Sequence, residues 1–278
     1  MSLTDFIVSL SIISIAAGLL GSLIGLGGGV IIVPVLTLLY KVDIRLAIGA
    51  SILSVIATSS GAAVTYVKEK LSNLRAGMFL EIATTVGAIS GAYLTTIIAS
   101  QSLFLLFAIV LSYSAITILK KRKDPEILTK SDDKIANYLN LHGSYYDENE
   151  KKTVRYKVQH TKLGLGIMYI AGMVSALLGV GSGALKVPAM DSAMHMPIKA
   201  SAATSDFMIG VTAAASAGAY FVRGEINPLI AGPVVLGVLV GAVIGSRLLN
   251  KIPSRLIKSI FVVVLIVVAI EMLQRGLS

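Results

Sequence analysis

Long apolar runs, separated by short polar connections, make up most of this chain. In the first half the runs cover residues 6–24, 29–40, 46–67, 76–99 and 103–119. In the second half they cover residues 163–178, 183–194, 200–222, 229–249 and 256–273. A run of about 20 residues crosses a bilayer as a helix, and the second run of each half is too short to do so. The pattern predicts an all-α integral membrane protein.

The two halves repeat each other at a constant offset of 154 residues. Segment 18–36 reads GLLGSLIGLGGGVIIVPVL, and segment 172–190 reads GMVSALLGVGSGALKVPAM. The matched pairs include Gly25 with Gly179, Gly27 with Gly181, Gly29 with Gly183, and Pro34 with Pro188. Hydrophobic segments that glycines interrupt at corresponding positions of two halves are typical of a transporter's binding site. We expect two inverted repeats of about five segments each, whose glycine-broken hairpins meet near the bilayer midplane.

The repeats divide the chain into a first membrane repeat (1–119), a linker (120–161) and a second membrane repeat (162–278). The linker is polar and dense in both charge signs, which indicates a solvent-facing loop. Its residues 132–141 predict a short helix, because the acidic start suits a helix N-terminus. The linker is either a regulatory or partner-docking element, or a connection that lets the second half insert. We favour the second interpretation.

The distribution of Lys and Arg predicts the topology. If the first two runs of each half form a hairpin that returns to its starting side, the basic residues gather on one face. A single crossing by that pair spreads them more evenly. The first arrangement makes the halves inverted, places both termini outside and places the 120–161 loop in the cytoplasm. Whether segments 6–24 and 163–178 span fully or are re-entrant stays open.

Composition excludes several classes of protein. The chain of 278 residues is 55% hydrophobic and 14% charged, whereas soluble domains are about 25% charged. The net charge of +9 follows from topology, so nucleic acid is not an expected partner. There is no cysteine, and the three histidines have no ligand-like spacing, so we expect no metal and no cofactor. No nucleophile–base pair and no ATP-binding Gly-x-x-x-x-Gly-Lys motif is present, so we do not expect an enzyme.

The two glycine clusters are the first candidate site. They comprise Gly25, Gly27, Gly28 and Gly29 in the first half and Gly179, Gly181, Ser182 and Gly183 in the second. Each interior glycine costs a helix about 1 kcal/mol relative to alanine, so the clusters predict breaks. A break frees backbone amides at the start of the next helix, where the helix dipole favours an anion. The alternative is that the glycines only permit close helix packing, which is how we interpret 87–91 and 237–245.

Charged side chains inside apolar segments are functional candidates, because they are costly there. Lys186 follows the second glycine cluster, and Asp206 lies in the third segment of that half. Either the two pair with each other as a structural ion pair, or Lys186 faces the anion while Asp206 tunes it. Asp206 is also a candidate carrier of a coupled proton. We interpret Glu81 as structural, with Arg75 or the membrane interface within its reach.

Three hydroxyl residues complete the candidate site. Ser51 and Ser205 occupy matching places early in the third segments, and Thr204 precedes Ser205. Their hydroxyls can donate hydrogen bonds to a bound oxyanion. Alternatively they bond to carbonyl groups of their own or a neighbouring helix. Their symmetric placement beside the glycine clusters favours the first interpretation.

The duplicated glycine pattern, followed by GAS in the first half and ATS in the second, resembles the TauE/SafE family of sulfite exporter-like membrane proteins. The resemblance covers the chain apart from the 120–161 loop. It implies a polytopic helical transporter in the cell membrane that handles sulfur-containing anions such as sulfite, sulfonates or thiosulfate. The second copy departs from the pattern at Ser182 and Lys186, which affects the expected substrate more than the fold.

Together these features predict a secondary transporter of a small anion that works by alternating access. Hairpins 25–34 and 179–188 would form the binding centre. The expected partners are the small-molecule anion and the lipid bilayer, with a coupling ion and the oligomeric state left open. The alternatives are an anion channel on the same scaffold, and a membrane scaffold or assembly protein that acts through the 120–161 loop.

Overall fold

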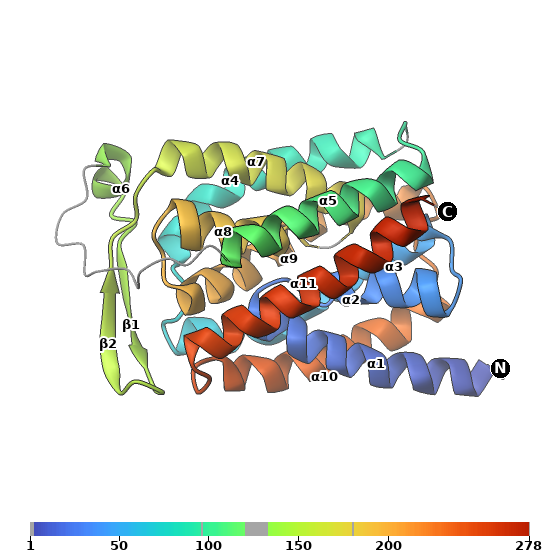
Figure 1. Ribbon diagram of the computed structural model, residues 1–278, viewed down its shortest axis with the longest axis horizontal. Coiled ribbons are helices and arrows are strands. Elements are labelled where there is room, and N and C mark those ends of the chain that lie inside the picture. Colours follow the sequence, from blue (N-terminus) through green and yellow to red (C-terminus); the bar gives the residue numbers. More distant parts are fainter. Residues whose placement is uncertain (1–2, 96, 120–132, 180, 278) are drawn as a thin grey trace.

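The computed structural model describes residues 3–95, 97–119, 133–179 and 181–277, and its first half is helical (Figure 1). The elements of that half are α1 (Leu3–Ile24), α2 (Gly29–Pro34), the π-helix η1 (Val35–Leu39), α3 (Ile44–Lys68), α4 (Leu74–Leu94) and α5 (Ser100–Leu119). Those of the second half are α7 (Thr161–Leu178), α8 (Gly183–Pro188), the π-helix η2 (Ala189–Ala193), α9 (Ile198–Val222), α10 (Pro228–Leu249) and α11 (Ser254–Leu277). The same order of elements therefore occurs twice.

The predicted all-α membrane architecture is confirmed. Among the described residues, six helices are long and apolar enough to cross a membrane: α1, α3, α4, α7, α10 and α11. Helices α2 and α8 have only six residues each and continue into the π-helices. Such an element is about 16 Å long at 1.5 Å per residue, about half of a bilayer core, as the sequence predicted for these two segments.

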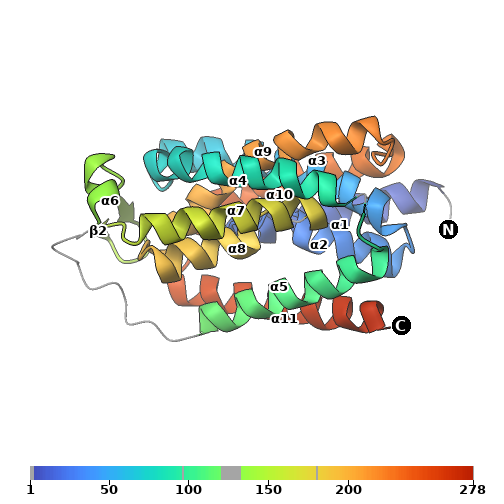
Figure 2. The ribbon, with the colours of Figure 1, turned by 90° about the horizontal axis from the view of Figure 1, so that it is seen from above.

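The long helices of each half pack against long helices of the other half. The first long helix of each half packs on the third long helix of the other, so α1 lies against α10 and α7 lies against α4. Helix α3 packs on its counterpart α9, and α5 on its counterpart α11, and the two latter helices lie side by side in both views (Figures 1 and 2). Both chain termini lie at one end of the bundle (Figure 1).

Part of the linker folds against the other end of the bundle (Figure 1). The predicted short helix is present as α6 (Lys134–Tyr138), capped by Asp133, whereas residues 120–132 lie outside the described part of the chain. The sequence analysis missed a hairpin of two antiparallel strands, β1 (Gly143–Asp147) and β2 (Lys152–Tyr156). Strands of five residues with several charges give little hydrophobic alternation, so periodicity could not detect them.

A buried ion pair fastens this hairpin to the membrane helices. Lys199 Nζ donates to Asp147 Oδ1 at 2.8 Å and to the carbonyl of Asn250 at 3.0 Å, and both members of the ion pair are buried. Asn73 Nδ2 adds a hydrogen bond to the carbonyl of Leu141 at 2.7 Å. The expectation of a solvent-facing linker is therefore wrong for the residues that make this contact, because charged groups on its two sides pair with each other, whereas residues such as 148–153 are exposed.

The glycines at 87–91 and 237–245 serve close packing, as predicted. A Cβ atom on Gly87 would lie 2.1 Å from the carbonyl oxygen of Tyr169, and one on Gly241 would lie 2.0 Å from that of Ile15. The two contacts lie at matching positions of the two halves. One joins α4 to α7, and the other joins α10 to α1. Backbone approach of this kind stabilises helix pairs in membranes.

Gly87→Ala should destabilise the bundle, because the new methyl group overlaps backbone that cannot move independently. Overpacking costs about 1–3 kcal/mol, so a lower midpoint of thermal unfolding in detergent is expected. Gly166→Ala is the matched control, since nothing lies within 4 Å of its added Cβ atom. Equal midpoints for the two variants would contradict the close contact of α4 with α7.

Candidate functional site

Both glycine clusters interrupt the helices, as the sequence predicted. We call residues 25–28, between α1 and α2, the first break and residues 179–182, between α7 and α8, the second break. The backbone φ angles are +71° at both Gly25 and Gly27, and +65° and +59° at Gly179 and Gly181. Left-handed values of this kind favour glycine, because it has no Cβ atom. The chain direction at each break therefore depends on these four residues.

Ser182 departs from the glycine pattern without disturbing it. Its φ angle is −56°, close to the −61° of Gly28, the matching residue of the first half. Both values are ordinary for any residue. The serine therefore adds a hydroxyl group to the second break at no conformational cost.

The two breaks touch each other and helices α3 and α9. A Cβ atom on Gly183 would lie 2.1 Å from the carbonyl oxygen of Gly25, and one on Gly29 would lie 2.7 Å from that of Gly179. All residues of both breaks that the structure describes are buried. Breaking the helix and permitting close approach were alternative explanations of these glycines, and the structure shows both.

Serines of α3 and α9 bind the breaks across the two halves. Ser51 Oγ donates to the carbonyl of Gly179 at 2.5 Å, and Ser205 Oγ donates to the carbonyl of Gly25 at 2.7 Å. The expectation that these hydroxyls face an oxyanion is not what this conformation shows, because each proton already serves a carbonyl oxygen. These bonds join the halves at their closest approach.

Thr204 does not face the breaks. Its Oγ1 accepts a hydrogen bond of 2.9 Å from the backbone amide of Asn73, in the connection between α3 and α4. Neighbouring helical residues point about 100° apart, which separates Thr204 from Ser205. Its predicted place in the anion site is therefore wrong for this conformation.

Several hydrogen-bond donors at the breaks are unused. Within the described part of the chain, the amides at 29, 30, 183 and 184 bond to no other group. The hydroxyl of Ser182 is buried and likewise has no partner among described residues. In the first break, by contrast, the Gly28 amide donates to Thr58 Oγ1 at 3.1 Å. Unpaired donors at the start of a helix suit an anion.

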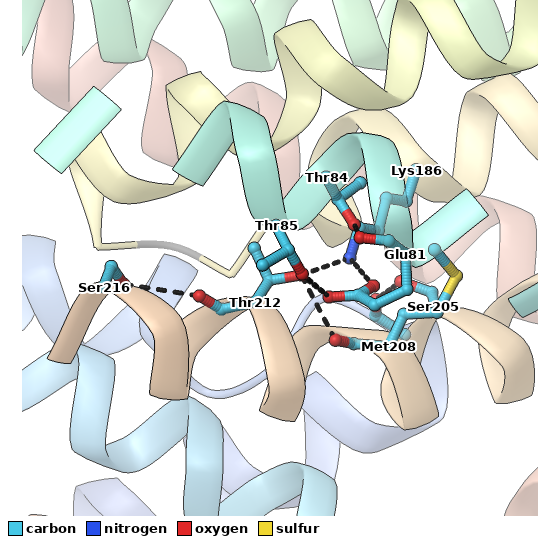
Figure 3. Close-up of polar contacts among 9 residues, drawn as sticks. Glu81, Thr84, Thr85, Lys186, Ser205, Met208, Thr212 and Ser216 are labelled. Atoms are coloured by element: carbon cyan, nitrogen blue, oxygen red, sulfur yellow. Dashed lines mark hydrogen bonds and ion pairs between the residues drawn. The ribbon is translucent and has the colours of Figure 1, made fainter. Parts of the chain in front are cut away.

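A buried charged cluster lies beside the second break (Figure 3). Lys186 Nζ lies 3.2 Å from Glu81 Oε2 and 2.7 Å from Thr212 Oγ1. Thr212 in turn donates to Glu81 Oε1 at 2.5 Å. Of the alternatives, the pairing of Lys186 with Asp206 is therefore not the one found, and Glu81 binds Lys186 instead of Arg75. The partner was missed because it lies on α4, 105 residues away in the sequence.

The charged cluster has no equivalent in the repeat. Ile32 occupies the place that matches Lys186, and Val235 occupies the place that matches Glu81, whereas Thr58 matches Thr212. An amine and a carboxylate have been added around one break only. Buried ionisable groups of this kind mark functional positions in membrane proteins.

Asp206 stands apart from this cluster. Its side chain is fully buried, and neither carboxylate oxygen has a hydrogen-bond partner among the described residues. The residue at the matching position of the first half is Ile52. Among the described residues there is also no cluster of three or more His, Asp or Glu side chains that could hold a metal ion.

The fold and these buried contacts define a polytopic helical membrane protein with a polar centre at two interrupted helices. The model of the family "Sulfite exporter TauE/SafE" matches residues 10–272. The chain therefore belongs to the TauE/SafE family, a family of membrane transporters.

Several relatives are named as probable membrane transporter proteins. YunE of Bacillus subtilis is 30% identical over 277 residues, which are 97% of this chain and 98% of the relative. YdhB of the same species is 26% identical over 87% of this chain and 90% of its own length. MJ0441 of Methanocaldococcus jannaschii is 27% identical over 73% and 68% of the two chains. No solved structure matches this chain.

Lys186→Met should destabilise the protein strongly, because it leaves the Glu81 carboxylate buried without its cation. Breaking a buried pair costs about 3–5 kcal/mol, and replacing both members costs less. Unfolding in detergent should therefore show partial recovery in the Lys186→Met/Glu81→Gln double variant.

The matched control is Lys258→Met, which removes a partly exposed pair with Asp191 at 3.3 Å. That change should cost about 1 kcal/mol or less. Strictly additive effects of the Lys186 and Glu81 substitutions would show that the two groups do not interact.

Proposed function

We propose that the protein is a secondary transporter of a small anion, in particular a sulfur-containing oxyanion or organosulfonate such as sulfite, thiosulfate or a sulfonate. The single observation that carries this proposal is the contact of two helix breaks whose following amides have no partner among the described residues. The family name supports sulfur oxyanions as the substrate class. The cell membrane is the proposed location, with the 120–161 loop in the cytoplasm and both termini outside.

The second break offers the stronger anion site. The amides at 183 and 184 and the hydroxyl of Ser182, which have no partner among the described residues, are neutral donors at a helix start. Lys186, three residues further on, supplies the positive charge. It is held by Glu81 and Thr212, so an arriving oxyanion would compete with the Glu81 carboxylate for the amine. A fixed cation with such a competitor binds an anion reversibly, as transport requires.

The packing of each half's helices against the other half supports alternating access as the proposed mechanism. In Figure 1, α2 lies toward the end of the bundle with the termini and α8 toward the end with the β-hairpin. Two breaks that enter from opposite ends are the arrangement expected of inverted repeats. Rocking of one half against the other would then open one side at a time. The bonds of Ser51 and Ser205 to the opposite breaks are the contacts that such a motion would exchange.

An anion channel on the same scaffold is the competing function. The described residues of the two breaks lie against each other through backbone atoms and are buried. That contact favours a transporter, which never opens both sides together. The scaffold alternative has less support, because the described part of the linker binds the protein's own membrane helices.

Purified protein in proteoliposomes should take up sulfite, thiosulfate or a sulfonate with saturable kinetics, in preference to sulfate and carboxylates. Ser182→Ala should raise the apparent KM of that anion about tenfold or more. A hydrogen bond to a charged group contributes about 1.5–3 kcal/mol, and 1.4 kcal/mol corresponds to a factor of ten.

Ser60→Ala is the control, since that hydroxyl is exposed and donates only to the carbonyl of Ile56 in its own helix. It should leave uptake unchanged. Folded protein that moves no anion of the panel would refute the transporter, and a non-saturating single-channel current would favour the channel.

A further inference from the structure

Asp206 lies on the face of α9 that packs against the first break. A Cβ atom on Gly25 would meet the backbone of Ala202 at 2.6 Å, and one on Gly27 would meet the side chain of Ile209 at 3.0 Å. Residues three and four apart share one side of a helix, so Asp206 belongs to the same face as both. The adjacent Ser205 binds the carbonyl of Gly25. The carboxyl group is therefore next to the contact that joins α9 to the break.

The described charged groups near Asp206 do not compensate a negative charge on its carboxyl group. On α4 and α8, Glu81 and Lys186 bind each other. On α3, the Tyr66 hydroxyl donates its hydrogen bond to the carbonyl of Ser22 and not to Asp206. On α1, α7, α11 and η2, no described side chain forms a hydrogen bond with the carboxyl group of Asp206. An ionised carboxylate here would thus be an isolated buried charge, which is prohibitively unfavourable, and such groups take up a proton instead.

A metal cation is a poorer occupant of this position than a proton. Na⁺, like other hard cations, needs several oxygen ligands around it. Among the described residues, no group of three His, Asp or Glu side chains that could hold a metal ion gathers at Asp206. A proton needs only the carboxylate itself.

We propose that Asp206 is a proton-binding site through which anion movement is coupled to H⁺. This inference rests on the proposed transport function for its coupling and on the geometry alone for the bound proton. In the conformation described, the side chain is the neutral acid. When the break moves away from α9, water reaches the carboxyl group, the O–H bond breaks, and the proton passes to that water. Return of the contact requires one proton to be bound again.

The bound proton can be measured without transport. Infrared spectra of the purified protein in liposomes at neutral pH should contain the C=O band of a protonated carboxylic acid. Asp206→Asn should remove that band, and the control Glu81→Gln should leave it. An unchanged spectrum in Asp206→Asn, or a band that disappears when choline is replaced by Na⁺, would overturn the proposal.

Stability gives a second test that does not depend on activity. The substitution Asp206→Ile introduces isoleucine into the surroundings of Asp206. Isoleucine is the residue at the matching position of the first half, Ile52. Because the substitution removes a buried polar group that lacks partners, the variant should unfold at the same temperature as the unmodified protein or higher. A large loss of stability would show that Asp206 makes a structural contact, against the proposal.

The coupling itself is tested by flux. An imposed gradient of one pH unit should drive accumulation of the transported anion by up to about tenfold at one proton per anion. In Asp206→Asn the ratio of uptake with and without the gradient should fall to one. Anion uptake that ignores the gradient in the unmodified protein would refute the coupling but leave the transporter intact. Absence of any anion uptake would refute the proposed function, while the infrared result would still decide whether Asp206 holds a proton.

Discussion

The backbone contact between the two helix breaks is the constraint on which the rest of the structure depends. Gly183 lies against the Gly25 carbonyl, and Gly29 lies against the Gly179 carbonyl, at distances that leave no room for side chains. Buried carbonyl groups need donors. Ser51 and Ser205, each from the opposite half, supply them. One contact therefore explains the glycine clusters, their repetition and the paired serines.

The two breaks share a backbone design but have different surroundings. The second break lies beside the charged pair of Lys186 and Glu81, whereas the first lies beside α9 at the position of Asp206. The matching positions of the other repeat hold aliphatic residues. A duplicated scaffold has thus acquired a cation near one break and an acid near the other. This division suits an anion and a proton that are handled at separate places within one moving unit.

The fold followed from the sequence more completely than the site did. Apolar run length, glycine clustering and the constant offset predicted the helices and both breaks, because these signals are local or repeat along the chain. The Lys186–Glu81 pair depends on α4 of one half packing over the second break of the other, which no local pattern reveals. The hydrogen bonds from the serines to carbonyl groups could not be predicted from the sequence either, because every residue has a carbonyl group. The short, charged strands of the β-hairpin gave no periodic signal.

The most direct test of the central claim is the reactivity of a single cysteine at the second break. The chain has no cysteine, so Ser182→Cys carries the one thiol. Membrane-impermeant thiol reagents should modify it from an aqueous side during turnover, and a saturating transported anion should protect it. A thiol that reacts equally with and without the anion, or that never reacts in active protein, would contradict the placement of the binding centre at the breaks.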